Sequence, residues 1–223
     1  MALLAKTQKK SFLKKFDFPS KEQKNEIRLY SSLYMKKKLL IALGIIALGA
    51  ILYFSKAGDY LQASLIQMPE TVTLQTNLGD IKIKLLPAEA PNLTRNFVAL
   101  AKDDMYDGTI FHRVIEGFMI QGGDYENANG TGGSSYVGED MEDEFSQNLS
   151  HVRGVVSMAN RGPNTNGSQF FIVQQDAPFL DGRHSIFGQV IEGMETVDRI
   201  ASAKTGPNDA PIERITVFDV VAE

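Results

Sequence analysis

The sequence has no cysteine and only three histidines, His112, His151 and His184, among its 223 residues. Without cysteine the chain forms no disulfide and offers no thiolate to a metal. The histidines also lack the spacing of four residues that places two imidazoles on one face of a helix. We therefore expect no metal site. The missing cysteines fit a reducing cytosol and a cell exterior equally well, so they do not indicate the compartment.

Motifs of covalent and phosphate chemistry are missing as well. Gly167-Ser168-Gln169 lacks the flanking pattern of a nucleophile elbow. Gly132-Gly133 lacks the lysine and the helix start of a phosphate-binding loop. Covalent catalysis and phosphoryl transfer are therefore poorly supported. What remains is binding, or a reaction that breaks no covalent bond.

Charge is divided unevenly along the chain. Residues 1–38 hold eleven Lys and Arg against three Asp and Glu, whereas the whole chain has a formal charge of −4. With Lys56 counted apart, residues 57–223 carry −13. Such an asymmetry indicates two environments rather than one evenly charged globule. Because nucleic acids attract basic surfaces, we do not expect the acidic part to bind them.

The uncharged run from Leu39 to Phe54 predicts a membrane anchor. It follows Lys36-Lys37-Lys38 and precedes Lys56. A helix from Lys36 to Lys56 would extend about 31 Å, close to the ~30 Å of a hydrocarbon core. The flank richer in lysine lies on the N-terminal side, so the N-terminus is expected in the cytoplasm and the C-terminal part outside.

We therefore divide the chain into a basic cytoplasmic tail (1–34), a single transmembrane helix (35–56), a linker or stalk (57–70) and a main domain (71–223). A cleaved signal peptide that begins at Met35 is the chief alternative, and it would release a secreted domain. A buried core helix is a further alternative for the apolar run. The basic tail could also lie along the membrane surface.

The main domain has the pattern of short strands and two helices. Apolar residues alternate with polar ones on both sides of Asn77-Leu78-Gly79-Asp80, which predicts a β-hairpin. Residues 91–102 change to a helical period, with Pro91 near the start. Further elements are expected as strands around 153–158, 168–173 and 185–190, a helix at 194–201 and a last strand at 215–221. The pattern favours a closed antiparallel barrel with a helix over each end.

Two stretches indicate an apolar cleft. Phe111 to Asp124, FHRVIEGFMIQGGD, sets one cation, Arg113, in a run of large apolar side chains and ends on Gln121, two glycines and an aspartate. Ser157 to Val173, SMANRGPNTNGSQFFIV, follows downstream. Together they suggest a cleft with an arginine and several amides at its rim.

These blocks, with NGTGGSSYVGE and FLDGRHSIFGQVIEGMETVD, resemble the signature blocks of the cyclophilin family of peptidyl-prolyl cis-trans isomerases. The similarity covers about residues 71–222, and the compact loops resemble those of bacterial members. The resemblance implies an eight-stranded barrel capped by two helices. It also implies an enzyme that needs no cofactor and acts on proline-containing polypeptides.

The resemblance assigns catalysis to Arg113, Phe118 and Gln121. Rotation about an X–Pro bond is opposed by a barrier of about 18–20 kcal/mol. A guanidinium aimed at the prolyl nitrogen would stabilise the twisted transition state more than the ground state. Arg113 corresponds to the arginine that does this in the family. The plain alternative for Arg113 is a surface ion pair.

The remaining site residues follow from the same resemblance. Phe118, Met119, Phe171 and Leu180 would line the slot for the proline ring, although barrel core is the usual place for such residues. Gln121, Asn160 and Gln169 would hold the substrate backbone or stand at the rim, and His184 would stand at the pocket edge. Ala159 belongs to the same substrate-binding set. We expect His112 to be a buried, hydrogen-bonded structural histidine and His151 to be structural.

Two positions depart from the family pattern. Phe179 stands where many members carry a tryptophan that binds cyclosporin, and phenylalanine has no indole donor. We therefore expect weak cyclosporin binding. Arg161 stands where a small alanine is common in the family. This position borders the site for the substrate residue on the N-terminal side of the X–Pro pair. The long cationic side chain of Arg161 is expected either to narrow the opening of that site or to favour acidic residues there.

The sequence thus predicts a membrane-anchored, monomeric prolyl isomerase that assists the folding of proteins outside the cytoplasm. One alternative is a proline-peptide binding module or holdase that uses the same groove without useful catalysis. Another is a barrel that carries a small apolar ligand in an open interior.

Overall fold

The computed structural model describes residues 21, 29, 37, 38, 44 and 68–223. The chain divides into two units, Met1–Ser55 and Lys56–Glu223. The predicted tail, anchor and linker lie outside the described residues, apart from the five isolated positions and residues 68–70. No helix within the described part of the chain is both long and apolar enough to cross a membrane.

The main domain is built on one antiparallel sheet of eight strands, in the order β3-β4-β6-β5-β7-β2-β1-β8. Its strands are β1 (Thr71–Thr76), β2 (Gly79–Leu85), β3 (Arg113–Ile115), β4 (Met119–Gly122), β5 (Val155–Met158), β6 (Phe170–Val173), β7 (Ile186–Glu192) and β8 (Val217–Ala222). The mainly β fold that the sequence predicted is therefore confirmed.

The first two strands form the predicted hairpin. Val72, Leu74 and Thr76 turn their side chains into the domain, and the residues between them face outward. This alternation is what a strand with one buried face requires. The turn closes at Gly79, whose φ of +121° a residue with a Cβ would adopt only with strain. Thr76 Oγ1 donates a hydrogen bond of 2.6 Å to the Gly79 carbonyl oxygen.

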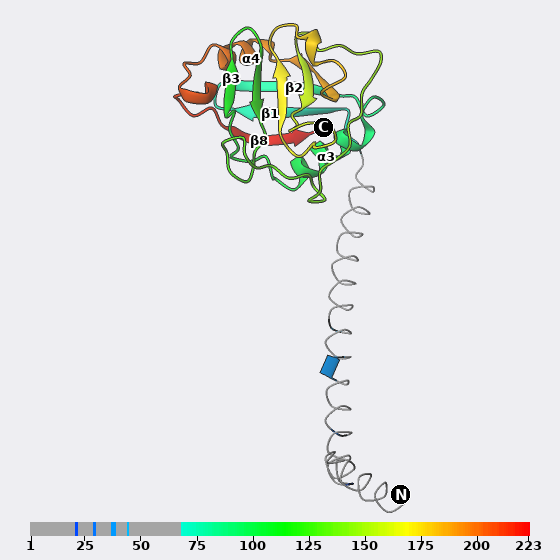
Figure 1. Ribbon diagram of the computed structural model, residues 1–223. Helices are drawn as coiled ribbons and strands as arrows, with labels where there is room; N and C mark the ends of the chain where they lie inside the picture. Colours follow the sequence, from blue (N-terminus) through cyan, green and yellow to red (C-terminus); the bar gives the residue numbers. More distant parts are fainter. Residues whose placement is uncertain (1–20, 22–28, 30–36, 39–43, 45–67) are drawn as a thin grey trace, which may run out of the picture. The chain divides into compact units, whose positions relative to one another are not determined.

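Two α-helices lie at opposite sides of the curled sheet, α4 at the top and α3 at the bottom of Figure 1. Helix α3 spans Pro91–Lys102 and begins with a proline. Proline suits this position because the N–H groups of the first turn have no acceptor within the helix. Helix α4 spans Met194–Ala201. Two short 3-10 helices, η1 (Pro178–Leu180) and η2 (Pro207–Asp209), belong to the loops that reach the site.

The sheet is a curled half-barrel whose two edge strands are β3 and β8. The strands that the structure describes do not pair into the closed barrel that the sequence predicted. The segment before β3 nevertheless reaches the start of β8. The N–H of Phe111 donates to the Ile215 carbonyl oxygen over 3.0 Å, and the N–H of Gly108 donates to the Val217 carbonyl oxygen over 2.9 Å.

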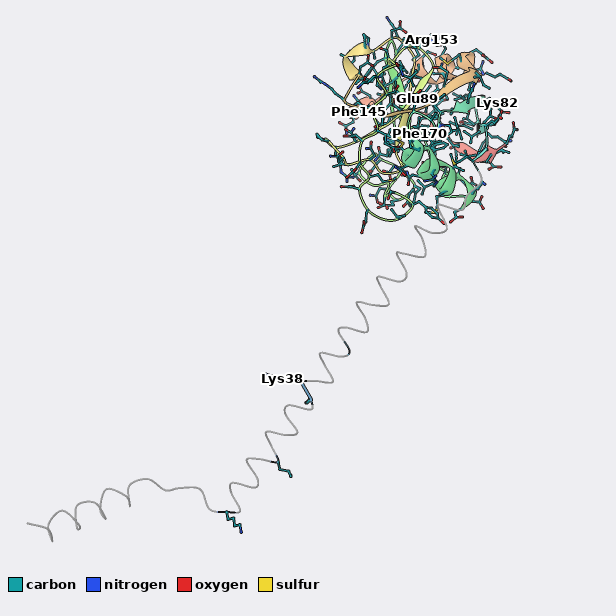
Figure 2. All side chains as sticks on the ribbon, turned by 90° about the vertical axis from the view of Figure 1, so that its right-hand side faces the viewer. Lys38, Lys82, Glu89, Phe145, Arg153 and Phe170 are labelled. Carbon is teal, nitrogen blue, oxygen red and sulfur yellow. The ribbon has the colours of Figure 1, made fainter. Side chains whose placement is uncertain are left out.

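Apolar side chains gather in two separate clusters. The larger one fills the interior of the sheet and contains Phe97, Tyr106 and Phe170, whose rings meet edge to face or at a tilt. Figure 2 shows Phe170 in the middle of the domain. The smaller one, which we call the outer cluster, consists of Met119, Val155, Phe171, Val173, Ala177 and Ile186, with partly buried neighbours around it.

Candidate functional site

Arg113 and Gln121 stand side by side on neighbouring strands. Arg113 opens β3, Gln121 lies in β4, and the two residues are direct cross-strand partners. Directly opposite residues point to the same face of a sheet. A cation and an amide are therefore presented together, as the sequence predicted. Arg113 keeps 43% of its side chain exposed.

The guanidinium of Arg113 is held from one side by Asp209. Its Nε donates to Asp209 Oδ2 over 3.4 Å. Within the described residues, the structure gives no hydrogen-bond partner to the two terminal nitrogens of Arg113. Those nitrogens are therefore available to a substrate.

Asp209 comes from η2, in a loop that folds back on itself. Ile212 N–H donates to the Lys204 carbonyl oxygen, and Gly206 N–H donates to that of Ala210. Asn208 and Asp209 both have positive φ, of 61° and 58°. Sequence reasoning missed Asp209. Pro-Asn-Asp indicates a turn, but nothing in that pattern says that the turn faces Arg113.

The amides of Gln121 and Gln169 are locked into one orientation. Gln169 Nε2 donates to the carbonyl oxygens of Gly130 and Gly132, over 3.0 and 2.6 Å. Its Oε1 is therefore free to accept from Gln121 Nε2, over 2.9 Å. The carbonyl oxygen of Gln121 has no partner within the described residues, so it can accept a hydrogen bond from a bound peptide.

A small hollow of about 70 Å³ lies beside these amides. It gathers five residues that the sequence assigned to substrate binding: Gln121, Ala159, Asn160, Arg161 and Gln169. The Asn160 side chain is used inside the domain, because its Nδ2 donates to the Arg183 carbonyl oxygen over 2.8 Å. Arg161 Nη2 pairs with Asp140 Oδ1 over 2.8 Å, and both side chains are exposed.

The four residues expected to line a proline slot either belong to the outer cluster or pack against it, and none lies in the interior core. They are Phe118, Met119, Phe171 and Leu180. The strand register explains why Phe171 faces the outer cluster. Phe171 lies opposite Gln121 in β4 and opposite Ser157 in β5. Its neighbour Phe170 therefore faces the opposite side of the sheet, into the interior.

Phe179 extends the apolar wall outward. It sits in η1 with 61% of its surface exposed. Its ring centroid lies 5.6 Å from that of Phe118. The two rings form an open apolar edge beside the buried outer cluster.

His184 meets Phe171 edge-on, with ring centroids 5.2 Å apart and planes at 88°. Its Nδ1 donates to the Met158 carbonyl oxygen over 3.0 Å, so Nε2 is the acceptor in the neutral ring. Burial lowers the pKa of His184 and favours that neutral form. His184 thus lies at the edge of the outer cluster, where the sequence placed it.

His112 differs in part from its expectation. The residue is buried, as predicted, but neither ring nitrogen has a hydrogen-bond partner within the described residues. Burial lowers the pKa of His112, which favours the neutral form of the ring. Across residues 68–223 and the few other positions described, no three His, Asp or Glu side chains gather in a group able to hold a metal.

Comparison with known proteins identifies a family for the domain. Residues 71–222 match the family described as cyclophilin type peptidyl-prolyl cis-trans isomerase/CLD. The chain is 52% identical over 146 residues to peptidyl-prolyl cis-trans isomerase CYP18-1 of Arabidopsis thaliana, which covers 65% of this chain and 91% of that protein. It is 48% identical over 154 residues to the much longer CYP71 of the same plant, of which it covers 24%.

A solved structure gives the same result. The chain resembles a cyclophilin type peptidyl-prolyl cis-trans isomerase of Cryptosporidium parvum, crystallised in the presence of the dipeptide Ala-Pro. The TM-score is 0.66 at 40% sequence identity, over 69% of this chain and 98% of that one.

Proposed function

The chain belongs to the cyclophilin-type peptidyl-prolyl cis-trans isomerases and is an isomerase of X–Pro bonds, and we propose that Arg113 is the residue that lowers the rotation barrier. The observation that carries this assignment is the cross-strand pairing of Arg113 with Gln121 at the rim of the outer cluster. A guanidinium, an oriented amide and an apolar slot then meet in one place.

The physical reason lies in the amide bond. Conjugation of the prolyl nitrogen with the carbonyl gives the barrier of about 18–20 kcal/mol. When the bond twists, the nitrogen lone pair localises and becomes a better hydrogen-bond acceptor. A terminal nitrogen of Arg113 that donates to it binds the twisted form more strongly than the planar form, and only that difference speeds the step. Arginine stays charged throughout, so no proton is transferred.

The surrounding residues hold the substrate while its bond turns. Phe118, Met119, Phe171 and Leu180 offer an apolar wall to the proline ring. The free carbonyl oxygen of Gln121 accepts from a backbone N–H of the peptide. With the ring and the backbone fixed, rotation is confined to the part of the peptide that precedes the proline.

The test is cis-trans exchange of a proline peptide, followed by NMR, with the full chain and its Arg113→Ala variant. We expect exchange to slow by about 10²–10³-fold in the variant, as when one donor to a transition state is removed. Peptide affinity should change far less. If Arg113→Ala retains most of its catalysis, the assignment to Arg113 is wrong. If wild type binds the peptide without speeding exchange, the groove acts as the binding module or holdase considered above.

We further propose that residues 35–56 anchor the protein in a membrane, with the N-terminus in the cytoplasm and the domain outside, where it assists the folding of exported proteins. The support is the uncharged run between Lys36–Lys38 and Lys56. Alkaline carbonate extraction and protease protection of intact cells test the anchor and its direction. A soluble product that begins after residue 56 would favour a cleaved signal.

Other features remain proposals with their own support. The hydrogen bonds of residues 108–111 with 215–217 join the segment before β3 to the start of β8, which supports closure of the half-barrel at this point. Phe179 in place of an indole donor supports weak cyclosporin binding. The compact loops support a bacterial type.

A further inference from the structure

Three polar side chains form a hydrogen-bonded chain behind the outer cluster. Ser157 Oγ lies 2.9 Å from His151 Nε2, and His151 Nδ1 lies 2.6 Å from Asp181 Oδ1. Asp181 Oδ2 accepts a further hydrogen bond from Ser150 Oγ over 2.5 Å. The order Ser-His-Asp is that of a hydrolase triad. Ser157 is fully buried, however, so it cannot meet a substrate and does not act as a nucleophile.

The chain of contacts defines the state of the imidazole. A carboxylate only accepts hydrogen bonds, so His151 Nδ1 is protonated and donates the hydrogen bond that Asp181 accepts. Nε2 is then the acceptor for the hydroxyl of Ser157. His151 is 1% exposed, and its polar atoms are satisfied within the domain. Such a satisfied buried network fixes one arrangement of its members.

His151 also ties both ends of the short helix η1. The N–H of Ala177, which precedes η1, donates to the His151 carbonyl oxygen over 2.7 Å. Asp181, which follows η1, accepts from the backbone N–H of His151 over 2.8 Å as well as from its ring. The other main-chain hydrogen bonds of residues 177–181 stay within residues 177–184. His151 therefore holds both ends of η1 to the rest of the fold, beside the Ser150 bond to Asp181 and the ring contact of Phe118 with Phe179.

The same imidazole ring also packs against the outer cluster. The imidazole of His151 is stacked on Phe171, with centroids 6.0 Å apart and planes at 17°. Phe171 is one wall of the slot, and η1 carries two others, Phe179 and Leu180. One side chain thus sets the position of walls that come from β6 and from η1.

We propose that His151, acting with Asp181, is a positioning residue for prolyl isomerisation. It fixes η1 against β6, and so sets the width of the slot between Phe171 and the pair Phe179 and Leu180, without touching the substrate. This inference rests on the proposed role of the outer cluster as the proline slot.

The experiment compares Asp181→Ala and Asp181→Asn with wild type, all as the full chain. NMR titration with a proline peptide gives Kd, and exchange spectroscopy gives the isomerisation rate of the bound peptide. Asp181→Ala should raise Kd by about threefold to tenfold, the factor equivalent to one hydrogen bond. Asparagine keeps an acceptor for His151 Nδ1, so Asp181→Asn should restore most of the affinity. The bound-state rate should change less than Kd, because Arg113 is untouched.

Asp176→Ala is the matched control. Asp176 belongs to the same loop and accepts one backbone hydrogen bond, from Arg153 over 2.7 Å. It has no part in the link between His151 and η1. Its loss should destabilise the loop locally and leave Kd unchanged.

A coupling measurement separates positioning from general loosening. In a Phe179→Ala background the wall that Asp181 positions is already shortened, so Asp181→Ala should raise Kd by a smaller factor there. Equal factors in both backgrounds would overturn the proposal. A folded Asp181→Ala protein that binds the peptide as tightly as wild type would also overturn it.

The result also separates this inference from the proposed function. If Phe179→Ala and Phe171→Ala weaken binding but Asp181→Ala does not, the slot stands and the positioning role fails. If neither phenylalanine matters for affinity, the slot assignment fails and the role of His151 with it.

Discussion

The Nε of Arg113 donates to Oδ2 of Asp209 over 3.4 Å, although 96 positions separate the two residues in the chain. Both side chains are nearly half exposed, at 43% and 48%. Water screens such a pair, so its contribution to stability is small, about 0–1 kcal/mol. The ion pair instead orients the guanidinium of Arg113, because a carboxylate bound at Nε leaves the terminal nitrogens pointing away from Asp209.

Asp209→Ala should therefore reduce catalysis more than stability. We expect kcat/KM to fall about threefold to tenfold, because the guanidinium samples unproductive directions. The free energy of unfolding should change by no more than about 1 kcal/mol. Peptide exchange and urea unfolding measure the two quantities.

Glu223→Gln serves as the control for Asp209→Ala. It breaks a different exposed ion pair, in which Lys82 Nζ lies 2.7 Å from Glu223 Oε2. Lys82 lies at the edge of the domain in Figure 2. If both variants lower kcat/KM alike, orientation of Arg113 is not the cause.

Substitutions at the two adjacent phenylalanines should have different consequences. Phe170 packs among Phe97, Tyr106 and Phe111 in the interior, so Phe170→Leu should cost about 1–3 kcal/mol of stability with little effect on peptide affinity. Phe171→Leu should mainly weaken peptide binding. Thermal unfolding and peptide titration of both variants provide the comparison. Equal losses of affinity would mean that the outer cluster is not the slot.

Arg161 and Asp140 should have opposite effects on the preference for charged residues in the substrate. A charge pair at about 4 Å in water is worth about 1 kcal/mol, or about fivefold in rate. Wild type should prefer Glu over Lys at the position that flanks the X–Pro pair, and Arg161→Ala should abolish the preference. Asp140→Ala frees Arg161 from its partner and should increase the preference for Glu over Lys. Peptides with Glu, Ala and Lys at that position test the idea, and unchanged ratios in both variants would reject it.

Stability should decline as the pH falls from 7.5 to 5.5. Burial lowers the pKa of His112, His151 and His184 in the folded domain. The unfolded chain then takes up protons that the folded chain excludes, so stability is full above the ordinary value near 6.5 and is lost as the pH falls through it. We expect the melting temperature to fall by several degrees.

Carboxylates act in a different pH window. The hydrogen bond from Arg153 lowers the pKa of Asp198, so the stability that Asp198 contributes is lost only below its ordinary pKa of 3.8.

His112→Gln is the control for the histidine prediction. It removes one titrating ring and should show a smaller fall in melting temperature between pH 7.5 and 5.5. A wild-type melting temperature that is flat over this range would contradict the assignment of neutral buried histidines.

Local pattern was sufficient for the elements themselves. The helices expected at 91–102 and 194–201 are Pro91–Lys102 and Met194–Ala201 in the structure. The hairpin at residues 71–85 also formed where alternation and turn residues predicted it. Such signals depend on neighbours within a few residues, and these are visible in one sequence.

One strand begins later than the sequence predicted. The strand expected around 168–173 begins at Phe170, because Ser168 and Gln169 turn to the loop of residues 123–133 instead. Long-range hydrogen bonds decided that boundary. A periodicity of two does not report them.

By itself, the sequence determined the class of fold, the family and the residues that a proline slot would use, because these depend on composition, local period and motif order. Only the tertiary structure decided which partner each polar group takes. Asp209 reaches Arg113, and Asp181 reaches His151 across 30 positions, through loops whose paths follow from packing of the whole sheet. Register likewise decided that Phe171 faces the outer cluster while Phe170 faces the core. The physical reason is that hydrogen bonds and ring contacts act over a few ångströms in space, irrespective of separation along the chain.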